Sequence, residues 1–349
     1  MLKRRGYAVI GAITILGAAC LFLSLQPQAH FSAQAAMQPI ASQRTVDIAG
    51  KPAAPGVVLQ FEVVSDIHVQ AGDEFAKERF RLVLEDMAQN LPSRTDALVV
   101  NGDLGDGKPE DYDTLRRIVK DAQRKADYPP VLFNIGNHEF YQAFHNPLTR
   151  EWRAESFPNG ETDAKALARY LAFTGEKHVY YERVIRDYHF LFLGSEKSRM
   201  SDPKLGDAAY LSDLQIDWLK GKLKAGYVRN KPMFVFLHQP LFTAAGWGKT
   251  RFVIQQDELR KLFQAYPGLI LFSGHLHAQL GSPNTFLRDG YTLFNDSSPA
   301  RTRDTAFKIS EEKSEGLFVQ VYGDKVVVKG RDFLHHGFLP GVEYQVKDS

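Results

Sequence analysis

The sequence predicts an α/β (α+β sandwich) fold, in which two packed, mixed β-sheets are flanked by helices. Two observations support this prediction. Between residues 57 and 272, short apolar runs alternate with segments whose apolar residues recur at helical spacing, which is typical of a sheet covered by helices. Beyond residue 290 the pattern is rich in strands, and we expect these later strands to form the second sheet, packed on the first within one domain.

The individual elements follow from local patterns. Strands are expected at 57–65, 97–101, 131–135, 188–194, 233–237 and 269–272, and antiparallel strands at 291–294, 316–322 and 325–329. Helices are expected at 74–90, 109–126, 163–171, 213–223 and 255–264. Pro109 suits the first turn of its helix, where no backbone donor is needed. Ser212, followed three residues later by Gln215, predicts a capping box at the start of the fourth helix.

Residues 140–187 interrupt the alternation and are rich in aromatic side chains. We interpret them as an insertion that packs over one end of the sheet, mainly as a hydrophobic subcore, with Tyr141 and His145 as candidates for pocket residues. The folded domain is expected to span residues 57–335. A C-terminal tail is expected at 336–349.

The first 35 residues predict export. Three basic residues precede an apolar run from residue 7 to 25, and Ala33-Gln34-Ala35 offers a cleavage site, the pattern of a secretory signal peptide. The run is nearly long enough to span a bilayer, so an uncleaved membrane anchor is the alternative. Residues 36–56 are interpreted as a flexible linker. The expected location is extracellular or periplasmic, or tethered to the outer face of the cytoplasmic membrane.

Charge and cysteine content argue against general nucleic-acid binding and against disulfide bonds. Removal of residues 1–35 takes away three basic residues and no acidic residue, so the formal net charge falls from +2 to −1. No basic excess is left for general nucleic-acid binding. Cys20, the only cysteine, lies in the apolar run, so the mature chain has no disulfide. The composition leaves the oligomeric state open.

Metal-type side chains follow five of the expected strands, at the point where each strand ends. An isolated Asp66-Ile67-His68 is more often a hydrogen-bonded pair than a metal site. Ligands, however, gather at the carboxyl ends of strands in open α/β sheets. Five coincidences at this edge therefore favour a metal centre. The candidate residues are Asp66, His68, Asp103, Asn137, His138, His238, His275 and His277.

The types of these residues indicate the chemistry. Two Asp, one Asn and four His provide seven ligands, and each of two ions takes four if one Asp bridges them. A mixture of imidazole and carboxylate suits Mn, Fe, Zn or Co better than Ca or Mg. Two such ions can share a water, lower its pKa so that hydroxide forms, and bind the oxygens of a phosphoryl group. A further histidine beside them can protonate a leaving alkoxide.

The order of the motifs, Asp-x-His, Gly-Asp, Gly-Asn-His-Glu, His and Gly-His-x-His, resembles the calcineurin-like metallophosphoesterase superfamily. The resemblance covers about residues 58–300. It implies the four-layer fold of that superfamily, in which two packed mixed sheets are flanked by helices. This implied fold agrees with the fold predicted from the strand and helix pattern.

The resemblance also implies roles for individual residues. The first of two divalent ions would be held by Asp66, His68 and His277. The second would be held by Asn137, His238 and His275. Asp103 would bridge the ions and, with His138, take part in catalysis. His138 matches a histidine that is not a ligand and contacts the phosphate or the leaving oxygen, and Glu139 would orient its neighbours.

Departures from the pattern narrow the expected function. Protein Ser/Thr phosphatases of the superfamily carry Gly-Asp-x-Val-Asp-Arg-Gly and an Arg before Gly-Asn-His-Glu, whereas residues 102–107 read GDLGDG and Ile135 precedes Gly136. Both arginines are missing. The compact layout is similar to bacterial cyclic-nucleotide phosphodiesterases and related exported phosphohydrolases. We therefore expect an exported phosphoesterase acting on a small phosphate ester, with a diester favoured. The alternatives are a phosphomonoesterase and a membrane-tethered, metal-stabilised binding or scaffold protein.

Overall fold

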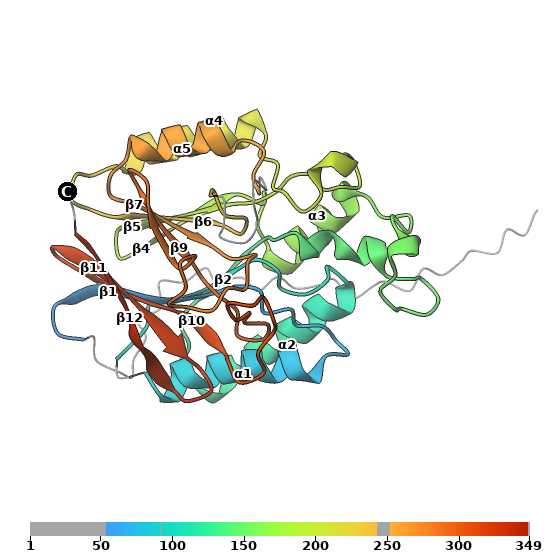
Figure 1. Ribbon diagram of the computed structural model, residues 1–349, viewed down its shortest axis with the longest axis horizontal. Helices are drawn as coiled ribbons and strands as arrows, with labels where there is room; N and C mark the ends of the chain where they lie inside the picture. The colour runs from blue at the N-terminus through green and yellow to red at the C-terminus, as the bar shows by residue number, and fades with distance from the viewer. Residues whose placement is uncertain (1–53, 92, 243–251, 348–349) are drawn as a thin grey trace, which may run out of the picture. The chain divides into compact units, whose positions relative to one another are not determined.

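The computed structural model describes residues 54–91, 93–242 and 252–347. They form two six-stranded mixed sheets that pack face to face, with helices on both outer faces (Figure 1). The predicted fold class is confirmed. The expected signal peptide or anchor at 1–35 and most of the expected linker lie outside the described residues. Across the described ranges, no helix combines the length and apolarity needed to cross a bilayer.

The first sheet joins the N-terminal and C-terminal parts of the domain. Its strands, from edge to edge, are β12 (Gly337–Lys347), β11 (Lys325–Asp332), β10 (Glu315–Tyr322), β1 (Val57–Val64), β2 (Ala97–Asn101) and β3 (Val131–Asn134). Strands β1, β2 and β3 are parallel, whereas β10 runs antiparallel to β1, with Val319 opposite Phe61. The carboxyl ends of β1, β2 and β3 therefore lie at one edge.

The second sheet is built from the middle of the chain. Its strands, in order, are β4 (Tyr181–Ile185), β5 (Tyr188–Leu193), β6 (Met233–Leu237), β7 (Leu269–Ser273), β9 (Thr292–Asn295) and β8 (Phe286–Arg288). The four inner strands β5, β6, β7 and β9 are parallel, and the two outer strands pair antiparallel to them. This sheet thus also presents several carboxyl ends at one edge.

The distribution of strands differs from the expectation. The strands after residue 310 extend the first sheet through the β1–β10 pair, and β9 is parallel to β7 within the second sheet. The expected tail at 336–349 is, over Gly337–Lys347, the edge strand β12, and β4 inside the expected insertion is another edge strand. Edge strands carry a weak apolar alternation and tolerate Pro340, which obscures them in the sequence. The apolar pattern identifies a strand but does not identify its neighbour.

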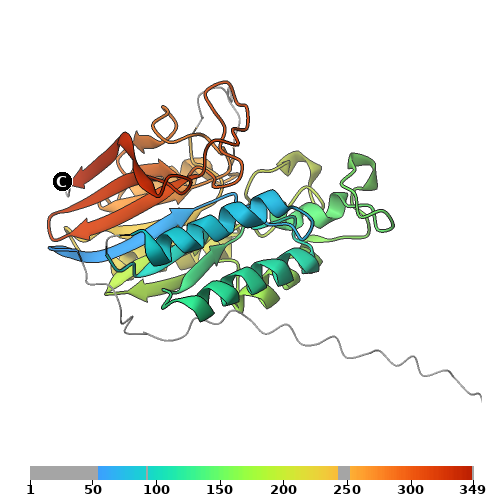
Figure 2. The same ribbon diagram turned by 90° about the horizontal axis from the view of Figure 1, so that it is seen from below.

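Helices complete the four layers. Helices α1 (Glu74–Gln89) and α2 (Pro109–Lys125) pack on the first sheet, and α4 (Asp213–Gly226) and α5 (Gln256–Gln264) pack on the second (Figures 1 and 2). The segment after β3 contains η1 (His138–Phe144), η2 (Ala154–Ser156) and α3 (Asp163–Thr174), and a further short turn, η3 (Pro203–Leu205), follows β5. Tyr170 of α3 is fully buried and donates a hydrogen bond to the carbonyl of Phe133 at 2.8 Å. The expected insertion is thereby attached to the end of β3.

The space between the two sheets is filled largely by phenylalanine rings. The ring of Phe61 on β1 lies 4.9 Å from the rings of Phe190 and Phe234, edge to face in both cases. Such contacts add about 0.5–1.5 kcal/mol each beyond the area that they bury. The aromatic layer holds the two sheets against each other, so their carboxyl ends meet.

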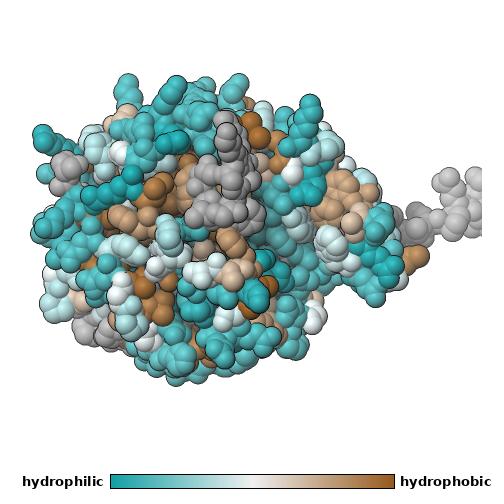
Figure 3. All heavy atoms as spheres, in the orientation of Figure 1, coloured by the Kyte–Doolittle hydropathy of each residue, from teal (hydrophilic) through white to brown (hydrophobic). Residues whose placement is uncertain are grey.

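On the face shown in Figure 3, hydrophilic and apolar residues are interspersed.

The predicted cap of α4 forms in part. The Oγ of Ser212 accepts the backbone N–H of Gln215 at 3.3 Å. The side chain of Gln215 does not return to the cap. Its Nε2 donates to the carbonyl of Gly194 at 2.9 Å and its Oε1 accepts the Gly194 N–H at 3.0 Å. Gln215 therefore ties α4 to the end of β5.

Candidate metal centre

All eight candidate residues lie just after strands β1, β2, β3, β6 and β7, seven of them in loops and His138 at the start of η1. The loops come from both sheets and converge at the carboxyl ends of the strands, where ligands usually bind in open α/β sheets. Three groups of side chains offer ligand atoms within 4.8 Å of one another: two include Asp103, and the third is His68, Asp106 and His138. The first group is Asp66, His68, Asp103 and His277, and the second is Asp103, His238 and His275.

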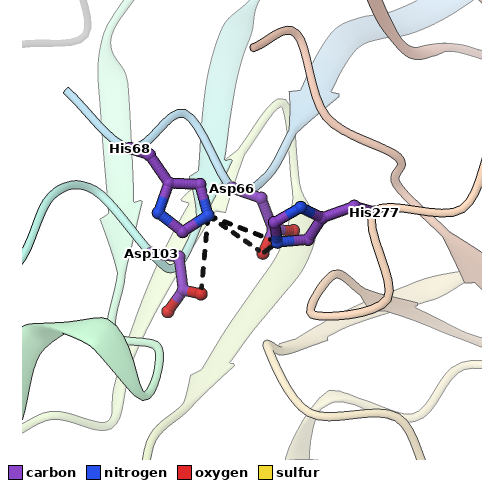
Figure 4. Close-up of side chains that lie close together, drawn as sticks. All are labelled: Asp66, His68, Asp103 and His277. Atoms are coloured by element: carbon purple, nitrogen blue, oxygen red, sulfur yellow. Dashed lines mark hydrogen bonds and ion pairs between the residues drawn. The ribbon is translucent and has the colours of Figure 1, made fainter. Parts of the chain in front are cut away.

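The first group points its ligand atoms into one small space (Figure 4). His277 Nε2 lies 2.9 Å from Asp66 Oδ1, and the Nε2 atoms of His68 and His277 are 3.2 Å apart. His68 Nε2 is 3.9 Å from Asp103 Oδ2. Two carboxylates and two imidazoles at these separations match the donor set of a divalent ion.

The second group shares Asp103 with the first. His238 Nε2 is 3.3 Å from Asp103 Oδ2 and 3.7 Å from Asp66 Oδ1. Asn137 Oδ1 lies 2.9 Å from His275 Nδ1, so the amide joins this group. Asp103 is thus common to two groups of side chains, and the resemblance assigns the other members of these groups to separate ions.

The residues present fit a bound cation. Asp66 Oδ1 and His238 Nε2 are buried. Among the described residues their nearest polar neighbours belong to the cluster itself, His277 Nε2 at 2.9 Å and Asp103 Oδ2 at 3.3 Å, and neither atom makes a well-aligned hydrogen bond. Their other polar atoms are satisfied, since Asp66 Oδ2 accepts from Ser65 Oγ at 2.6 Å and His238 Nδ1 contacts the Asn101 carbonyl at 2.8 Å. Buried polar atoms without partners are rare and costly. A divalent ion at this point would satisfy both atoms.

The charges of these side chains also favour a bound cation. Burial raises the pKa of Asp103, but the imidazoles of His238 and His138 outweigh it and hold that pKa well below its usual range. Burial lowers the pKa of His238, but Asp103 and Asp66 outweigh it and raise that pKa to about 10. The raised pKa of His238 reflects the negative charge of the two carboxylates, which bound divalent ions would compensate in place of the proton.

The backbone turns sharply to aim these side chains. A left-handed φ is uncommon for residues other than glycine and is found at functional sites. Five candidates adopt it, with φ values of 54° at Asp66, 44° at His68, 53° at Asp103, 70° at His275 and 54° at His277. These bends lie in the loops after β1, β2 and β7, each two or four residues beyond the strand end.

Two motif glycines are required because ligands approach them closely. A Cβ on Gly274 would overlap Ser65 Oγ and crowd Asp66 Oδ2. A Cβ on Gly136 would overlap Asp103 Oδ1. These glycines allow loops from different strands to touch at the centre.

Glu139 holds two of the loops together. Its Oε2 accepts the backbone N–H groups of Gly136 at 2.5 Å and Asp103 at 3.2 Å, and its Oε1 accepts that of Leu104 at 2.8 Å. The carboxylate is fully buried. The loop after β2, which carries Asp103, is thereby fastened to the loop after β3, in line with the orienting role that the resemblance implies.

His138 differs from the other histidines in its contacts. Its backbone N–H donates to Asp103 Oδ1 at 2.9 Å, and its Nδ1 lies 2.9 Å from Asp106 Oδ1. Its Nε2 lies 3.9 Å from Asp103 Oδ2. Burial lowers the pKa of His138, but Asp103 and Asp106 outweigh it and hold that pKa above its usual value. A protonated imidazole beside the cluster can donate a proton.

Sequence reasoning missed Asp106, which is buried between two histidines. A signal was present, because Asp106 is the second acidic residue of the Gly102–Gly107 stretch and follows Asp103 by three positions. Nothing in that local spacing indicates which side chain Asp106 contacts. Its partners come from the segment after β3.

An open cavity of about 680 Å³ adjoins His138. Its wall carries three basic side chains, Lys108, Arg150 and Arg301, and the half-exposed ring of Trp152. Their ion pairs are long: Lys108 lies 3.6 Å from a carboxylate oxygen of Asp111, Arg150 3.5 Å from Glu110, and Arg301 3.9 Å from Asp73. The cavity thus offers room and positive charge beside the cluster.

Two packed mixed sheets with a buried Asp/His cluster at their carboxyl ends define a metallophosphoesterase. Residues 60–279 match the calcineurin-like phosphoesterase family, and the chain belongs to that family. The family is one of phosphoester hydrolases, which accounts for the cluster and for the retained motif positions. No curated protein matches the sequence.

Solved structures share the fold at low sequence identity. A dimetal phosphatase from Danio rerio is 14% identical with a TM-score of 0.57, over 84% of this chain and 100% of that chain. The purple acid phosphatase of yellow lupin is 13% identical with a TM-score of 0.55, over 85% of this chain but only 55% of that chain. The GAP50 anchor in the inner membrane complex of Plasmodium is 12% identical with a TM-score of 0.50, over 83% and 88%. These similarities concern the fold.

Proposed function

We propose that this protein hydrolyses phosphate esters with two divalent ions, drawn from Mn, Fe, Zn and Co. One observation carries the proposal: two groups of ligand atoms share Asp103, and among the described residues the buried atoms Asp66 Oδ1 and His238 Nε2 make no well-aligned hydrogen bond. The ligands proposed for the first ion are Asp66, His68, Asp103 and His277. The ligands proposed for the second ion are Asp103, Asn137, His238 and His275. The complete set of ligand positions argues against a scaffold without turnover.

Two divalent ions held by these residues would lower the pKa of a bound water and bind phosphoryl oxygens. The residues of the chain do the rest. Asp103 holds the two halves of the site at a fixed separation, and its Oδ1 accepts the backbone N–H of His138. Because Asp106 holds Nδ1, the Nε2 of His138 is the ring nitrogen left to reach the substrate. As the ester bond breaks, Nε2 gives its proton to the leaving oxygen.

A phosphodiester is the favoured substrate class in this proposal. Both classes use the same metal pair, so the surroundings of the site have to distinguish them. The cavity of about 680 Å³ beside His138 leaves room for a second substituent on phosphorus. The three basic side chains on its wall favour the second candidate, a phosphomonoester of higher charge.

The proposed location is outside the cytoplasm. This part of the proposal rests on the basic and apolar N-terminal segment and on the Ala33-Gln34-Ala35 site. Fractionation of the native host, with N-terminal sequencing of the mature chain, tests it. A full-length chain in the cytosol would contradict export, and a full-length chain in the membrane would favour the uncleaved anchor.

The activity is tested with a substrate panel on protein loaded with Mn, Fe or Zn. The panel sets aryl phosphate monoesters, aryl diesters, cyclic nucleotides, nucleotide monoesters and phospholipid headgroups side by side. We expect turnover of diesters with higher kcat/KM than monoesters. Folded, metal-loaded protein that hydrolyses no member of the panel would reject the enzymatic function in favour of a scaffold.

A further inference from the structure

The carboxylate of Asp106 lies between two histidines. Its Oδ1 is 2.9 Å from His138 Nδ1, and its Oδ2 is 2.8 Å from His145 Nε2. Asp106 and His145 are both buried. His138, Asp106 and His145 therefore form one continuous chain that ends at the metal cluster.

The surrounding fold holds His145 in place. Its backbone N–H donates to the carbonyl of Gln142 at 3.0 Å and ends η1. It forms an antiparallel bridge with Trp152, and Asn159 Nδ2 donates to its carbonyl at 2.5 Å. The imidazole is thus presented to Asp106 from a segment fixed on both sides.

Counting donors and acceptors assigns the protons of His145. Its Nε2 faces a carboxylate oxygen of Asp106, and its Nδ1 faces the carbonyl of Arg150 at 3.0 Å. Both partners can only accept a hydrogen bond, so both ring nitrogens must donate. The hydrogen bond with Asp106 raises the pKa of His145, against partial burial and the charge of Lys108. His145 is accordingly an imidazolium ion.

This contact determines the orientation of Asp106. With a charged donor on Oδ2, the carboxylate presents Oδ1 to His138 in a fixed direction, and charge-assisted bonds of this kind are short and strong. His138 then donates through Nδ1 and keeps Nε2 toward the cluster. Without His145, Oδ2 would lose its donor and the carboxylate would be free to rotate.

We infer that His145 is a positioning residue for the leaving-group acid, acting on His138 through Asp106. The inference rests on the proposed phosphoesterase function. In the bond-breaking step the attacking hydroxide oxygen forms a bond to phosphorus and the ester P–O bond breaks. The leaving oxygen keeps the electron pair of the broken bond and takes the proton from His138 Nε2. His145 and Asp106 keep their protonation states throughout.

Leaving-group dependence tests this role. A nitrophenolate leaves without protonation, whereas an alkoxide needs it. Relative to the wild-type enzyme, His145→Ala should lower kcat about 10- to 100-fold on an alkyl phosphate ester. On the nitrophenyl analogue the loss of kcat should be less than about 3-fold. The KM for each ester should be unchanged. His145→Gln, whose amide nitrogen can donate to Asp106, should restore the alkyl ester rate to within about 3-fold of wild type. His335→Ala removes an exposed histidine and serves as the control.

The outcomes separate the two proposals. Equal loss on both esters, or a Gln variant as impaired as the Ala variant, would overturn the positioning role. Wild-type enzyme inactive on both esters would instead overturn the proposed function.

A second measurement needs no turnover. Nitrogen NMR of the zinc-loaded wild-type enzyme should show both ring nitrogens of His145 still protonated above the usual titration range of histidine. A neutral His145 ring in that spectrum would overturn the inference. Because it uses the wild-type enzyme, this measurement tests the inference even if a His145 variant fails to fold.

Discussion

The Nε2 atoms of His68 and His277 lie 3.2 Å apart, although 209 positions separate the two residues in the chain. His68 follows β1 of the first sheet, and His277 follows β7 of the second. The centre therefore forms only when the two sheets pack. Metal binding should stabilise that packing, because an ion bound to the folded state alone shifts the folding equilibrium.

Substitution of Asp103 tests the shared ligand. Asp103→Asn keeps the size of the side chain and removes its charge, so the chain should bind less metal and lose at least about 100-fold in turnover. Metal analysis of purified protein and steady-state kinetics measure the two effects. Asp324→Asn, in the exposed turn between β10 and β11, is the matched control. A variant that keeps two ions and nearly full activity would contradict the bridging role.

Substitution of His138 tests its separation from the ligands. His138→Ala should lower turnover about 100- to 10,000-fold, the range for loss of a general acid. The metal content should be unchanged, because the ligand groups are complete without this side chain. Metal analysis alongside kinetics decides the point, and loss of both ions from a folded variant would show that His138 is a ligand.

Two glycines provide a paired test of close approach. Gly274→Ala places a methyl group against Ser65 and Asp66, so metal affinity should fall about 10- to 100-fold. Gly221→Ala, in the open on α4, meets nothing and should raise the free energy of unfolding by about 1 kcal/mol. Metal titration and urea denaturation of both variants measure these effects. Equal metal affinity in the two variants would refute the steric argument.

Glu62 on β1 predicts a pH dependence of stability away from the site. The side chain is fully buried, and its carboxyl oxygens have no hydrogen-bond partner among the described residues. Burial, and next the charge of Asp86, raise the pKa of Glu62 well above its usual value, while Arg331 opposes them. The folded chain therefore keeps a proton that the unfolded chain releases. Stability from this group is present below the pKa of the unfolded state and is lost as the pH rises toward the folded pKa.

Glu62→Gln should remove this loss, because the amide is uncharged at every pH. As the pH rises above the ordinary pKa of glutamate, the variant should gain stability relative to wild type by up to about 1.4 kcal/mol per pH unit. Urea denaturation at constant metal saturation measures the difference. Parallel pH profiles for the two proteins would contradict the assignment.

Local patterns were sufficient for much of the fold and of the candidate site. The expected strands at 97–101 and 233–237 agree with β2 and β6 residue for residue. Long apolar runs bounded by turns leave little choice of secondary structure. The edge strands β4 and β12 were missed because each is only half-buried and lacks a strong pattern.

The sequence by itself determined which residue types stand at the ends of the buried strands, since both the strands and the side chains after them are local features. Asp66, Asp103 and His277 could be named in this way. Only the tertiary structure decided that β10 joins β1, that five residues of the centre adopt left-handed backbone conformations, and that Asp106 lies between His138 and His145. Strand partners and side-chain directions depend on contacts between segments far apart in the chain, and the packing of the two sheets determines them.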